Sequence, residues 1–309
     1  MRMKVSNYIS EMLVKAGIHQ AFMVTGGGAM HLDDALGHQE GLHCIYDHHE
    51  QACAIAAEAY ARLENKIAAV CVTTGPGGTN ALTGVVGGWL DSIPMFIVSG
   101  QVRYDTTARY ALQYTGTPLR AMGDQEYDIT KSVQYMTKFA AMLEDPKDIR
   151  YLLEKAWHLA TTGRPGPVWL DIPVNFQGGY IETDELRGYP AEDDAQLPPP
   201  VDDATIRTIL EKIKNAKRPV FHAGYGIRLS GGYAAFRSVA EKLNIPIVTY
   251  WNAVDLIEDD NPLYCGRAGQ LGYPERRLDS GRRHAHFYPP GRLQLEDLGP
   301  RGRGHHGGH

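Results

Sequence analysis

Residues 67–100, IAAVCVTTGPGGTNALTGVVGGWLDSIPMFIVSG, contain two apolar runs separated by a glycine-rich turn and a helical segment. The run that begins at Ile67 predicts a buried strand ending before Gly75, and the run that begins at Pro94 predicts a second buried strand. The intervening residues 79–90 predict a helix. Because strands that alternate with helices lie parallel in one sheet, this stretch predicts an α/β fold whose sheet is covered on both faces.

The same alternation continues on both sides of this stretch. Further strands are predicted at residues 21–24, 43–46 and 168–173, and further helices at 4–17, 31–36, 51–63 and 146–162. The helix at 51–63 is rich in alanine, so we expect it to pack closely against its neighbours. A second α/β unit follows, with predicted helices at 204–216 and 233–243 and predicted strands at 218–224 and 245–251.

These elements predict two domains and two segments outside them. We expect a first domain over residues 1–180, an acidic, proline-rich linker over 181–203 and a partial second domain over 204–275. Residues 276–309 are rich in Arg, Gly, His and Pro and have no apolar period, so we expect a disordered tail that builds no core. The abrupt change indicates a shifted reading frame, an artificial end or a naturally split subunit.

The composition is that of a globular protein without nucleic-acid or membrane partners. The chain has 309 residues, 43% of them hydrophobic and 22% charged, and a net charge of −5. The first residues lack the apolar core of a signal peptide, and no apolar run reaches the ~20 residues of a membrane span, so we expect a cytoplasmic protein. The cysteines lack metal-ligand spacing and are expected to be reduced thiols, with no metal site; they are Cys44, Cys53, Cys71 and Cys265.

Glu50 is the first candidate functional residue. It follows the predicted strand at 43–46 and starts the next helix, at the edge of a parallel sheet where ligands bind in open α/β folds. A carboxylate is electrostatically favoured at a helix N-terminus. The alternative is that Glu50 only caps its helix.

Two glycine-rich turns are further candidates. Residues 73–80, TTGPGGTN, follow a strand, and glycines there allow a positive φ and the close approach of a ligand to the backbone. Residues 25–28, TGGG, are a weaker form of the same feature. The alternative is a tight turn without a ligand, because this spacing is neither a Walker loop nor a GxGxxG fingerprint. The residues alone therefore predict a fold with turns at strand ends, and no reaction.

A resemblance adds the reaction. Six motifs of the first domain occur in the order of the thiamine-diphosphate-dependent acetolactate synthase family: TGGGA (25–29), HHEQACAIAAEAYAR (48–62), TTGPGGTN (73–80), WLDSIPMFIVSGQV (89–102), GDQEYDITKSVQYMTK (123–138) and GRPGPVWLDIPVNFQ (163–177). The segments 217–228, 240–257 and 261–272 resemble the start of that family's central domain. The resemblance implies a parallel-sheet pyrimidine-binding domain followed by a truncated, Rossmann-like α/β central domain.

The family's residue roles carry over by position. The resemblance implies that Glu50 hydrogen-bonds N1′ of the cofactor's aminopyrimidine, which favours the tautomer whose 4′-nitrogen can take the proton from C2. Gln125 matches a glutamine near the reacting substrate, and Lys138 matches a lysine near the substrate channel, where a solvated lysine is the alternative. The remaining matches are to cofactor-binding turns: Gly26, Gly27, Gly75, Pro76, Gly77 and Asn80.

The resemblance also implies the substrate class and the missing parts. We expect a lyase or carboligase that decarboxylates a 2-ketoacid such as pyruvate and transfers the acyl unit, as in branched-chain amino acid biosynthesis. A simple 2-ketoacid decarboxylase and a non-catalytic dimerisation subunit are the alternatives. Gly123-Asp124 precede Gln125 where the family commonly has an aromatic residue, and the turn at 25–28 also departs from the family form, so the acceptor stays open.

The cofactor expected is thiamine diphosphate, with Mg²⁺ and with FAD as an option. The family's diphosphate-binding domain carries a GDG motif that this sequence lacks, so the Mg²⁺ ligands are expected in a missing domain and the isolated chain is expected to be inactive. The expected partners are a second copy of the chain, in a homodimer or tetramer, or a separate chain that carries the diphosphate domain.

Overall fold

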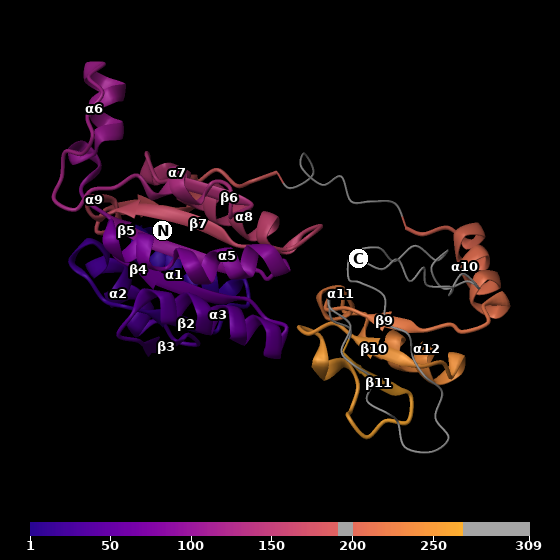
Figure 1. The fold of residues 1–309 in the computed structure, drawn as a ribbon. Helices are drawn as coiled ribbons and strands as arrows, with labels where there is room; N and C mark the ends of the chain where they lie inside the picture. The colour runs from indigo at the N-terminus through magenta and orange to yellow at the C-terminus, as the bar shows by residue number, and fades with distance from the viewer. Residues whose placement is uncertain (191–199, 268–309) are drawn as a thin grey trace. The chain divides into compact units, whose positions relative to one another are not determined.

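The computed structural model describes residues 1–190 and 200–267, and the contacts divide the chain into two units, residues 1–198 and 199–309. The first unit contains a six-stranded sheet in the order β3-β2-β4-β5-β7-β6, in which every neighbouring pair is parallel (Figure 1). Its strands are β2 Gln20–Met23, β3 His43–Tyr46, β4 Ala68–Val72, β5 Met95–Gln101, β6 Phe139–Met142 and β7 Val168–Pro173. The predicted α/β class is confirmed.

Helices cover both faces of this sheet. The helices of the first unit are α1 Val5–Lys15, α2 Met30–His38, α3 Glu50–Glu64, α4 Pro76–Asn80, α5 Leu82–Asp91, α6 Ala108–Thr115, α7 Ile129–Val133, α8 Ile149–Thr161 and α9 Val174–Gln177. Helices α1, α2 and α8 pack on one face, while α3 and α5 pack against each other on the other. That second contact is close, because a Cβ added at Gly84 would lie 2.6 Å from Cβ of Ala54.

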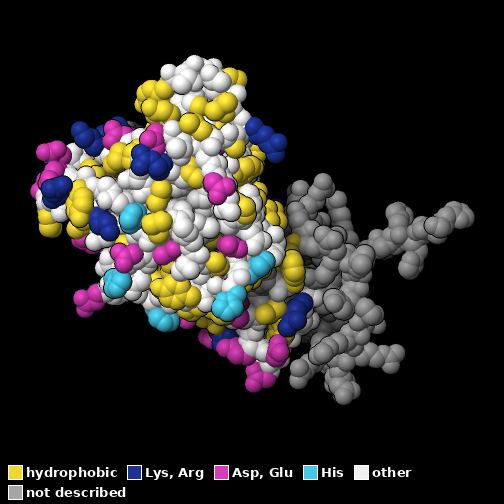
Figure 2. Space-filling view, turned by 90° about the vertical axis from the view of Figure 1, so that its left-hand side faces the viewer, with side chains coloured by type: hydrophobic (Ala, Val, Ile, Leu, Met, Phe, Trp, Pro, Cys, Tyr) yellow, Lys and Arg dark blue, Asp and Glu magenta, His cyan; other side chains and the backbone are white. Residues whose placement is uncertain are grey.

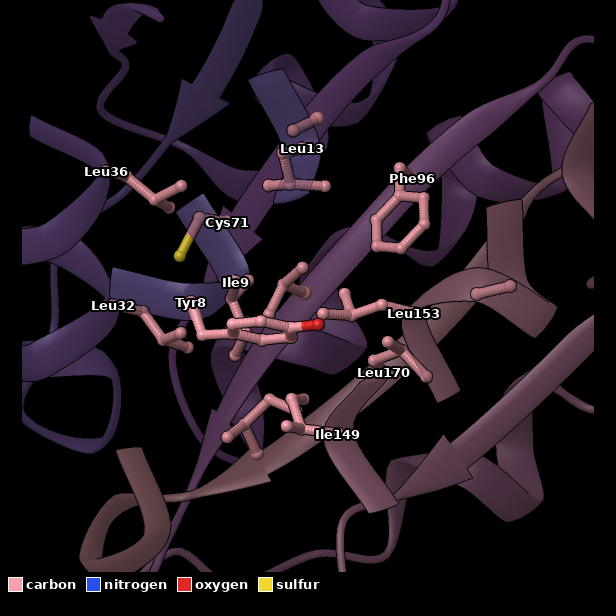
Figure 3. Packing of buried hydrophobic residues seen from close by; sticks show 14 of the residues in the cluster. Tyr8, Ile9, Leu13, Leu32, Leu36, Cys71, Phe96, Ile149, Leu153 and Leu170 are labelled. Carbon is pink, nitrogen blue, oxygen red and sulfur yellow. The ribbon is translucent and has the colours of Figure 1, made fainter. Parts of the chain in front are cut away.

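The main core lies between the sheet and the helices α1, α2 and α8. Tyr8, Ile9 and Leu13 of α1 point toward strand side chains such as Phe96 and Leu170 (Figure 3). A fully buried aliphatic side chain contributes roughly 1.5–3 kcal/mol, so this layer fixes the sheet on which the turns are mounted. Side chains alternate along a strand, and the other face of β5 and β7 therefore receives a second set: Ile97, Ser99, Trp169 and Asp171.

The structure differs from the sequence-based expectation at several places in this unit, and the strand β1 and the helices α6, α7 and α9 were not expected. The predicted helix at 79–90 is two helices, α4 and α5, with Ala81 between them. Strand β6 was not expected; it has four residues, three of them half-buried. The predicted linker at 181–203 begins too early, because β8 Tyr180–Glu182 pairs antiparallel with β1 Arg2–Lys4.

Residues after β8 also pack on the first unit. The 3₁₀ turn Thr183–Glu185 leads to Leu186, which is buried, and the ring of Tyr189 packs edge-on against Tyr151 of α8. These apolar contacts hold residues 181–190 against the helix layer, so this part of the predicted linker belongs to the first unit. Acidic and exposed positions around them hid the contacts in the sequence.

The second unit has a three-stranded parallel sheet in the order β11-β10-β9. Its strands are β9 Phe221–Ala223, β10 Ile247–Thr249 and β11 Tyr264–Arg267, and its helices are α10 Asp203–Asn215, α11 Gly226–Leu229 and α12 Tyr233–Leu243. The rings of Phe221 and Phe236 join strand β9 to helix α12 at a centroid distance of 5.3 Å. The end of the predicted second domain, 268–275, and the predicted tail, 276–309, lie outside the described residues. Within the described ranges, no helix has the length and apolar character that a membrane span requires.

Candidate functional site

Turns that follow β2, β3 and β4 meet at the carboxyl edge of the six-stranded sheet. The N–H of Gly28 donates to Oγ1 of Thr73 at 3.1 Å, which joins the turn after β2 to the turn after β4. A Cβ added at Gly26 would lie 2.5 Å from Cβ of Thr73, so only glycine fits there. Since parallel strands present their carboxyl ends at one edge, residues far apart in the sequence become neighbours.

Glu50 lies at this edge as the first residue of α3 and is half-buried. Nδ2 of Asn80 donates to its Oε2 at 2.6 Å. Its Oε1 faces Gly77, where an added Cβ would come within 3.6 Å. In the described part of the chain, Glu50 therefore takes its hydrogen bond from another turn and not from an N–H of its own helix. This geometry argues against a simple helix cap, and the helix N-terminus still favours the negative charge.

The turn at Gly75 requires glycine for two reasons. Its φ is +56°, and an added Cβ would overlap the carbonyl oxygen of Gln125. Pro76 follows as the first residue of α4, where its missing N–H has no consequence. Gln125 itself has a φ of +60° and an exposed side chain. The structure thus brings Gln125 beside the turn that carries Gly77 and Asn80.

Two buried polar atoms at this edge have no hydrogen-bond partner among the described residues. They are Oγ1 of Thr74, next to Gly75, and Oδ2 of Asp47, three residues before Glu50. Buried polar groups are nearly always paired, so each such atom in a folded protein calls for an explanation. Both lie in segments that also carry predicted site residues.

Residues that the sequence analysis missed hold the turn at 25–28. Oδ2 of Asp33 accepts the N–H of Gly26 at 3.0 Å, and burial raises the pKa of the Asp33 carboxyl. Nε2 of Gln177 donates to the carbonyl of Gly28 at 2.7 Å. A polar Asp33 on the helix next to a glycine turn was the available signal, while Gln177 is 149 residues from Gly28 and gave none. Gly27 is different, because an added Cβ there would meet no atom within 4 Å.

Lys138 lies elsewhere. It directly precedes β6 and is therefore at the amino edge of the sheet, opposite the glycine turns. Its Nζ donates to the carbonyl of Thr162 at 2.7 Å, and burial lowers the pKa of its ammonium group. The structure does not bring Lys138 together with Glu50 or Gln125.

The thiols and potential metal ligands are unremarkable. Cys44, Cys53 and Cys71 are free thiols, and burial together with Asp47 raises the pKa of Cys53, beside Glu50, to about 12. That thiol stays protonated at neutral pH. In residues 1–190 and 200–267, no group of three His, Cys, Asp or Glu side chains could hold a metal ion.

An apolar surface adjoins the segment that carries Gln125. Helix α6 projects from the sheet edge in Figure 1, and hydrophobic side chains gather on the projecting part in the space-filling view of Figure 2. The exposed hydrophobic residues of this segment are Leu112, Tyr114, Leu119, Met122 and Tyr127. The carboxyl edge therefore combines a polar turn cluster with an apolar border.

Comparison with known proteins gives two family matches. The family described as "Thiamine pyrophosphate enzyme, N-terminal TPP binding domain" matches residues 3–118, and "Thiamine pyrophosphate enzyme, central domain" matches residues 206–279. The first of these regions includes Glu50, Gly75 and Asn80.

Similar individual proteins are acetolactate synthase large subunits. That of Lactococcus lactis is 31% identical over 272 residues, which are 86% of this chain and 44% of that protein. That of Buchnera aphidicola from Schizaphis graminum is 34% identical over 245 residues, 77% of this chain and 40% of that protein. The probable large subunit of Methanocaldococcus jannaschii is 32% identical over 279 residues, 87% of this chain and 44% of that protein. The chain spans less than half the length of these relatives.

Proposed function

Because the chain belongs to the thiamine pyrophosphate enzyme family, through that family's N-terminal and central domains, we propose that the carboxyl edge of its first unit binds the aminopyrimidine of thiamine diphosphate. The observation that carries the proposal is the Asn80–Glu50 pair facing Gly77. One carboxylate oxygen is held by Asn80, and Oε1 is left for a ring nitrogen. The absence of a side chain at Gly77 leaves room for a flat ring against the turn.

Each of the proposed site residues has a definite task. When bound, thiamine diphosphate supplies the carbanion chemistry of 2-ketoacid decarboxylation. Glu50 shares a proton with the pyrimidine N1′ through a charge-assisted hydrogen bond, and Asn80 keeps the carboxylate in the required orientation. Gly26, Gly75 and Gly77 allow close approach of the backbone. Gln125, beside Gly75, contacts the reacting substrate.

The proposed reaction is the transfer of an acyl unit from a small 2-ketoacid such as pyruvate to an acceptor. Its support is the similarity to acetolactate synthase large subunits over most of this chain. The described residues contain no cluster for a divalent cation, so Mg²⁺ and the diphosphate would be held by residues outside them. We accordingly propose that the site is completed within a cytoplasmic homo-oligomer or by a chain that carries a diphosphate domain.

Two measurements test the proposal. The first is saturation-transfer NMR of thiamine with the 309-residue chain, whose aminopyrimidine signals should be attenuated on binding and much less so with Glu50→Gln. The second joins residues 1–267 to the part of the Lactococcus lactis large subunit that lies beyond its matched region, and supplies pyruvate, thiamine diphosphate and Mg²⁺. Release of acetolactate supports the carboligase, and release of free acetaldehyde would favour a decarboxylase.

A folded fusion that binds thiamine and forms neither product would contradict the proposed reaction. The unmodified Lactococcus lactis enzyme is the positive control. Size-exclusion chromatography of the 309-residue chain with that full-length enzyme then tests the remaining alternative, a non-catalytic subunit, which requires a stable complex.

A further inference from the structure

We infer that Gln101 and Asp171 are positioning residues, which together hold the segment 123–128, and with it Gln125, against the Gly75 turn. The role of Gln125 toward a substrate rests on the proposed function. The anchoring of the segment rests only on contacts within the first unit. Neither Gln101 nor Asp171 belongs to the residues expected to touch the cofactor.

Asp171 is a carboxylate buried inside the sheet layer. It lies on β7 opposite Ser99 of β5 and is 1% exposed. Oγ of Ser99 donates to its Oδ1 at 2.6 Å, and Nε2 of Gln101 donates to its Oδ2 at 2.9 Å. Among the described residues, it forms no ion pair; the charged groups that act on it from a distance are Asp128 and Arg109. Two neutral donors therefore hold a group that is costly to bury.

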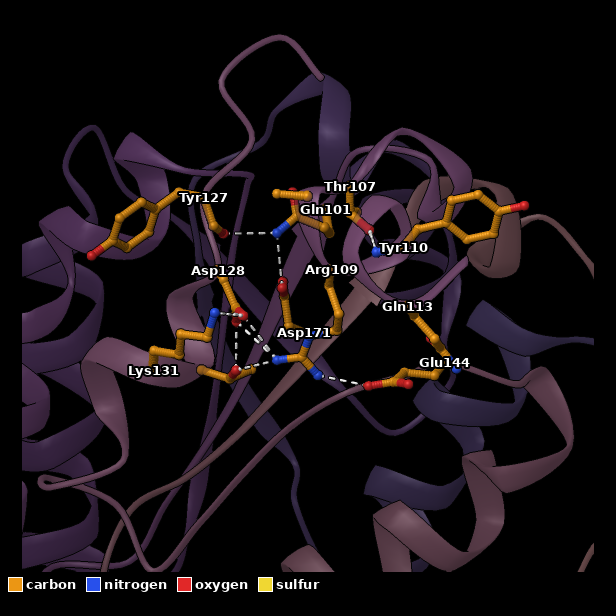
Figure 4. A network of polar contacts seen from close by, with 12 residues as sticks. Gln101, Thr107, Arg109, Tyr110, Gln113, Tyr127, Asp128, Lys131, Glu144 and Asp171 are labelled. Atoms are coloured by element: carbon orange, nitrogen blue, oxygen red, sulfur yellow. Dashed lines mark hydrogen bonds and ion pairs between the residues drawn. The ribbon is translucent and has the colours of Figure 1, made fainter. Parts of the chain in front are cut away.

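Gln101 connects this carboxylate to the segment 123–128. Its Nε2 also donates to the carbonyl oxygen of Tyr127 at 2.9 Å, and its Oε1 accepts the N–H of Val102 at 2.9 Å. Figure 4 shows the amide of Gln101 between Tyr127 and Asp171. Because both N–H donors and the oxygen are used, the amide has one orientation, which the buried carboxylate fixes.

The residues directly after Gln125 are each tied to the body of the unit. Glu126 accepts the N–H groups of Ala108 at 3.1 Å and Met122 at 2.8 Å. Tyr127 is held by Gln101, and Asp128 accepts from Nη2 of Arg109 at 3.0 Å. The three residues that follow Gln125 are thus each held in place by hydrogen bonds.

The conformation of Gln125 shows what these ties accomplish. Its φ of +60° is in the left-handed region, which residues other than glycine adopt infrequently. Its carbonyl oxygen lies where a side chain at Gly75 would be. Release of Tyr127 should therefore let Gln125 relax away from the turn.

The two hydrogen bonds to Asp171 differ in a way that an experiment can use. Gln101 contacts the segment 123–128, whereas Ser99 is contacted by Nε1 of Trp169 at 2.8 Å and not by that segment. Removing either donor weakens the burial of Asp171, but only the removal of Gln101 frees Tyr127. Ser99→Ala is consequently a matched control for Gln101→Met.

The test is hydrogen exchange of the 309-residue chain without cofactor. The N–H of Ile129 donates to the carbonyl of Tyr127 at 2.9 Å and that of Glu126 to Gly123 at 3.2 Å, so both amides report on the segment. Gln101→Met should accelerate their exchange by up to about tenfold, the scale of one lost hydrogen bond, while Ser99→Ala leaves it unchanged. Equal acceleration in both variants would reduce Gln101 to a general stabiliser and overturn the inference.

Asp171→Leu supplies a second, spectroscopic measurement. Leucine offers no acceptor to Nε2 of Gln101, so the amide of Gln101 loses the carboxylate that orients it and its hydrogen bond to Tyr127 is weakened. In the unsubstituted chain the indole N–H resonance of Trp169 reports through Ser99 on the charge of Asp171, and it should shift as that carboxyl titrates. In Asp171→Leu the shift should vanish, and Ile129 should exchange faster than in the unsubstituted chain, as in Gln101→Met.

Unchanged exchange at Ile129 in Asp171→Leu would contradict the inference. These measurements need no cofactor. A loss of thiamine binding with the expected exchange pattern would remove the proposed function and leave the anchoring established. Intact thiamine binding with an unresponsive segment would do the reverse.

Discussion

The two edges of the six-stranded sheet are built from the same strands and helices, yet they differ in how their polar groups are satisfied. At the carboxyl edge, Glu50 keeps one oxygen unpartnered within the described residues, and Thr74 buries an unpaired hydroxyl. At the amino edge, Lys138 is bonded to Thr162. That side of the unit also has a hollow of about 240 Å³ with mostly apolar walls, formed by Met12, Leu13, Lys15, Ala16, Phe96, Leu153, Glu154 and Trp157.

This difference indicates at which edge the fold tolerates a free-energy cost from unsatisfied polar groups. Unpaired buried polar atoms are typical of functional sites, because stability alone would remove them. The amino edge has apolar packing and a satisfied cation, as expected of a region that only supports the fold. Substitutions of similar chemistry at the two edges should therefore have different consequences.

The largest effect is expected for Glu50→Gln. Glutamine keeps the size of the side chain but cannot share a proton with a ring nitrogen as a carboxylate does. In the fusion protein described above, exchange of the C2 proton of thiamine diphosphate, followed by NMR, should slow by about 10²–10⁴-fold, the usual scale of an acid–base contribution. Glu64→Gln, at the exposed far end of α3, is the control and should exchange normally. Near-normal exchange in Glu50→Gln would overturn the assignment of this carboxylate.

Some features of the carboxyl edge could be predicted from the sequence and others could not. The strand at 168–173 was predicted with the bounds that the structure has, because a buried parallel strand is a nearly continuous apolar run. The strand at 43–46 also has its predicted bounds, although most of its side chains are exposed. The neighbourhood of Glu50, Gly77 and Asn80 followed from a family motif, and the contact of Gln125 with Gly75 followed from nothing local. It depends on a backbone conformation that no residue type marks.

Asp171 shows the same limit in the core. Its strand was expected, but the sequence pattern VWLDIP did not reveal that Asp171 bonds to Ser99 and Gln101 across two strands. The alternation of side chains along β7 places it on the same face as Trp169, and only the strand register brings Ser99 opposite to it. Register between distant strands is set by the whole sheet and not by the residues in contact.

The second largest effect is a pH dependence of stability. Burial raises the pKa of Asp171 to about 7 from its ordinary 3.8. Between these values the folded chain keeps a proton that the unfolded chain has released, so this group's contribution to stability is complete below pH 3.8 and is lost as the pH rises through 7. The loss is at most about 1.4 kcal/mol per pH unit.

Urea unfolding of the unsubstituted chain and of Asp171→Asn between pH 4 and pH 8 measures this contribution. Asparagine does not titrate, so the unfolding free energy of the unsubstituted chain should fall relative to that of the variant across this range. A constant difference between the two chains would show that Asp171 has an ordinary pKa in the folded state.

A smaller effect is expected for alanine at left-handed glycines. Gly75→Ala forces an unfavourable φ and also overlaps the Gln125 carbonyl, whereas Gly17→Ala, with a φ of +89° between α1 and β2, meets no atom within 4 Å. Backbone strain alone costs roughly 1–3 kcal/mol, so both variants should be destabilised and Gly75→Ala more so. Thermal unfolding compares them directly. Equal losses would mean that the segment 123–128 moves away from the added Cβ at residue 75 without a further loss of unfolding free energy.

The smallest effect is expected at the amino edge, for Lys138→Met. Methionine retains the apolar stem beside Gly166 and removes the hydrogen bond to Thr162. It also removes an ammonium group whose charged form is disfavoured by burial, as the lowered pKa of Lys138 indicates. The net loss of unfolding free energy should be at most about 1 kcal/mol. Because Lys138 lies opposite Glu50 across the sheet, turnover of pyruvate by the fusion protein should stay within about twofold, the range of substitutions remote from a site. A loss of turnover comparable to that of Glu50→Gln would place this lysine in the substrate path and remove the functional contrast between the two edges.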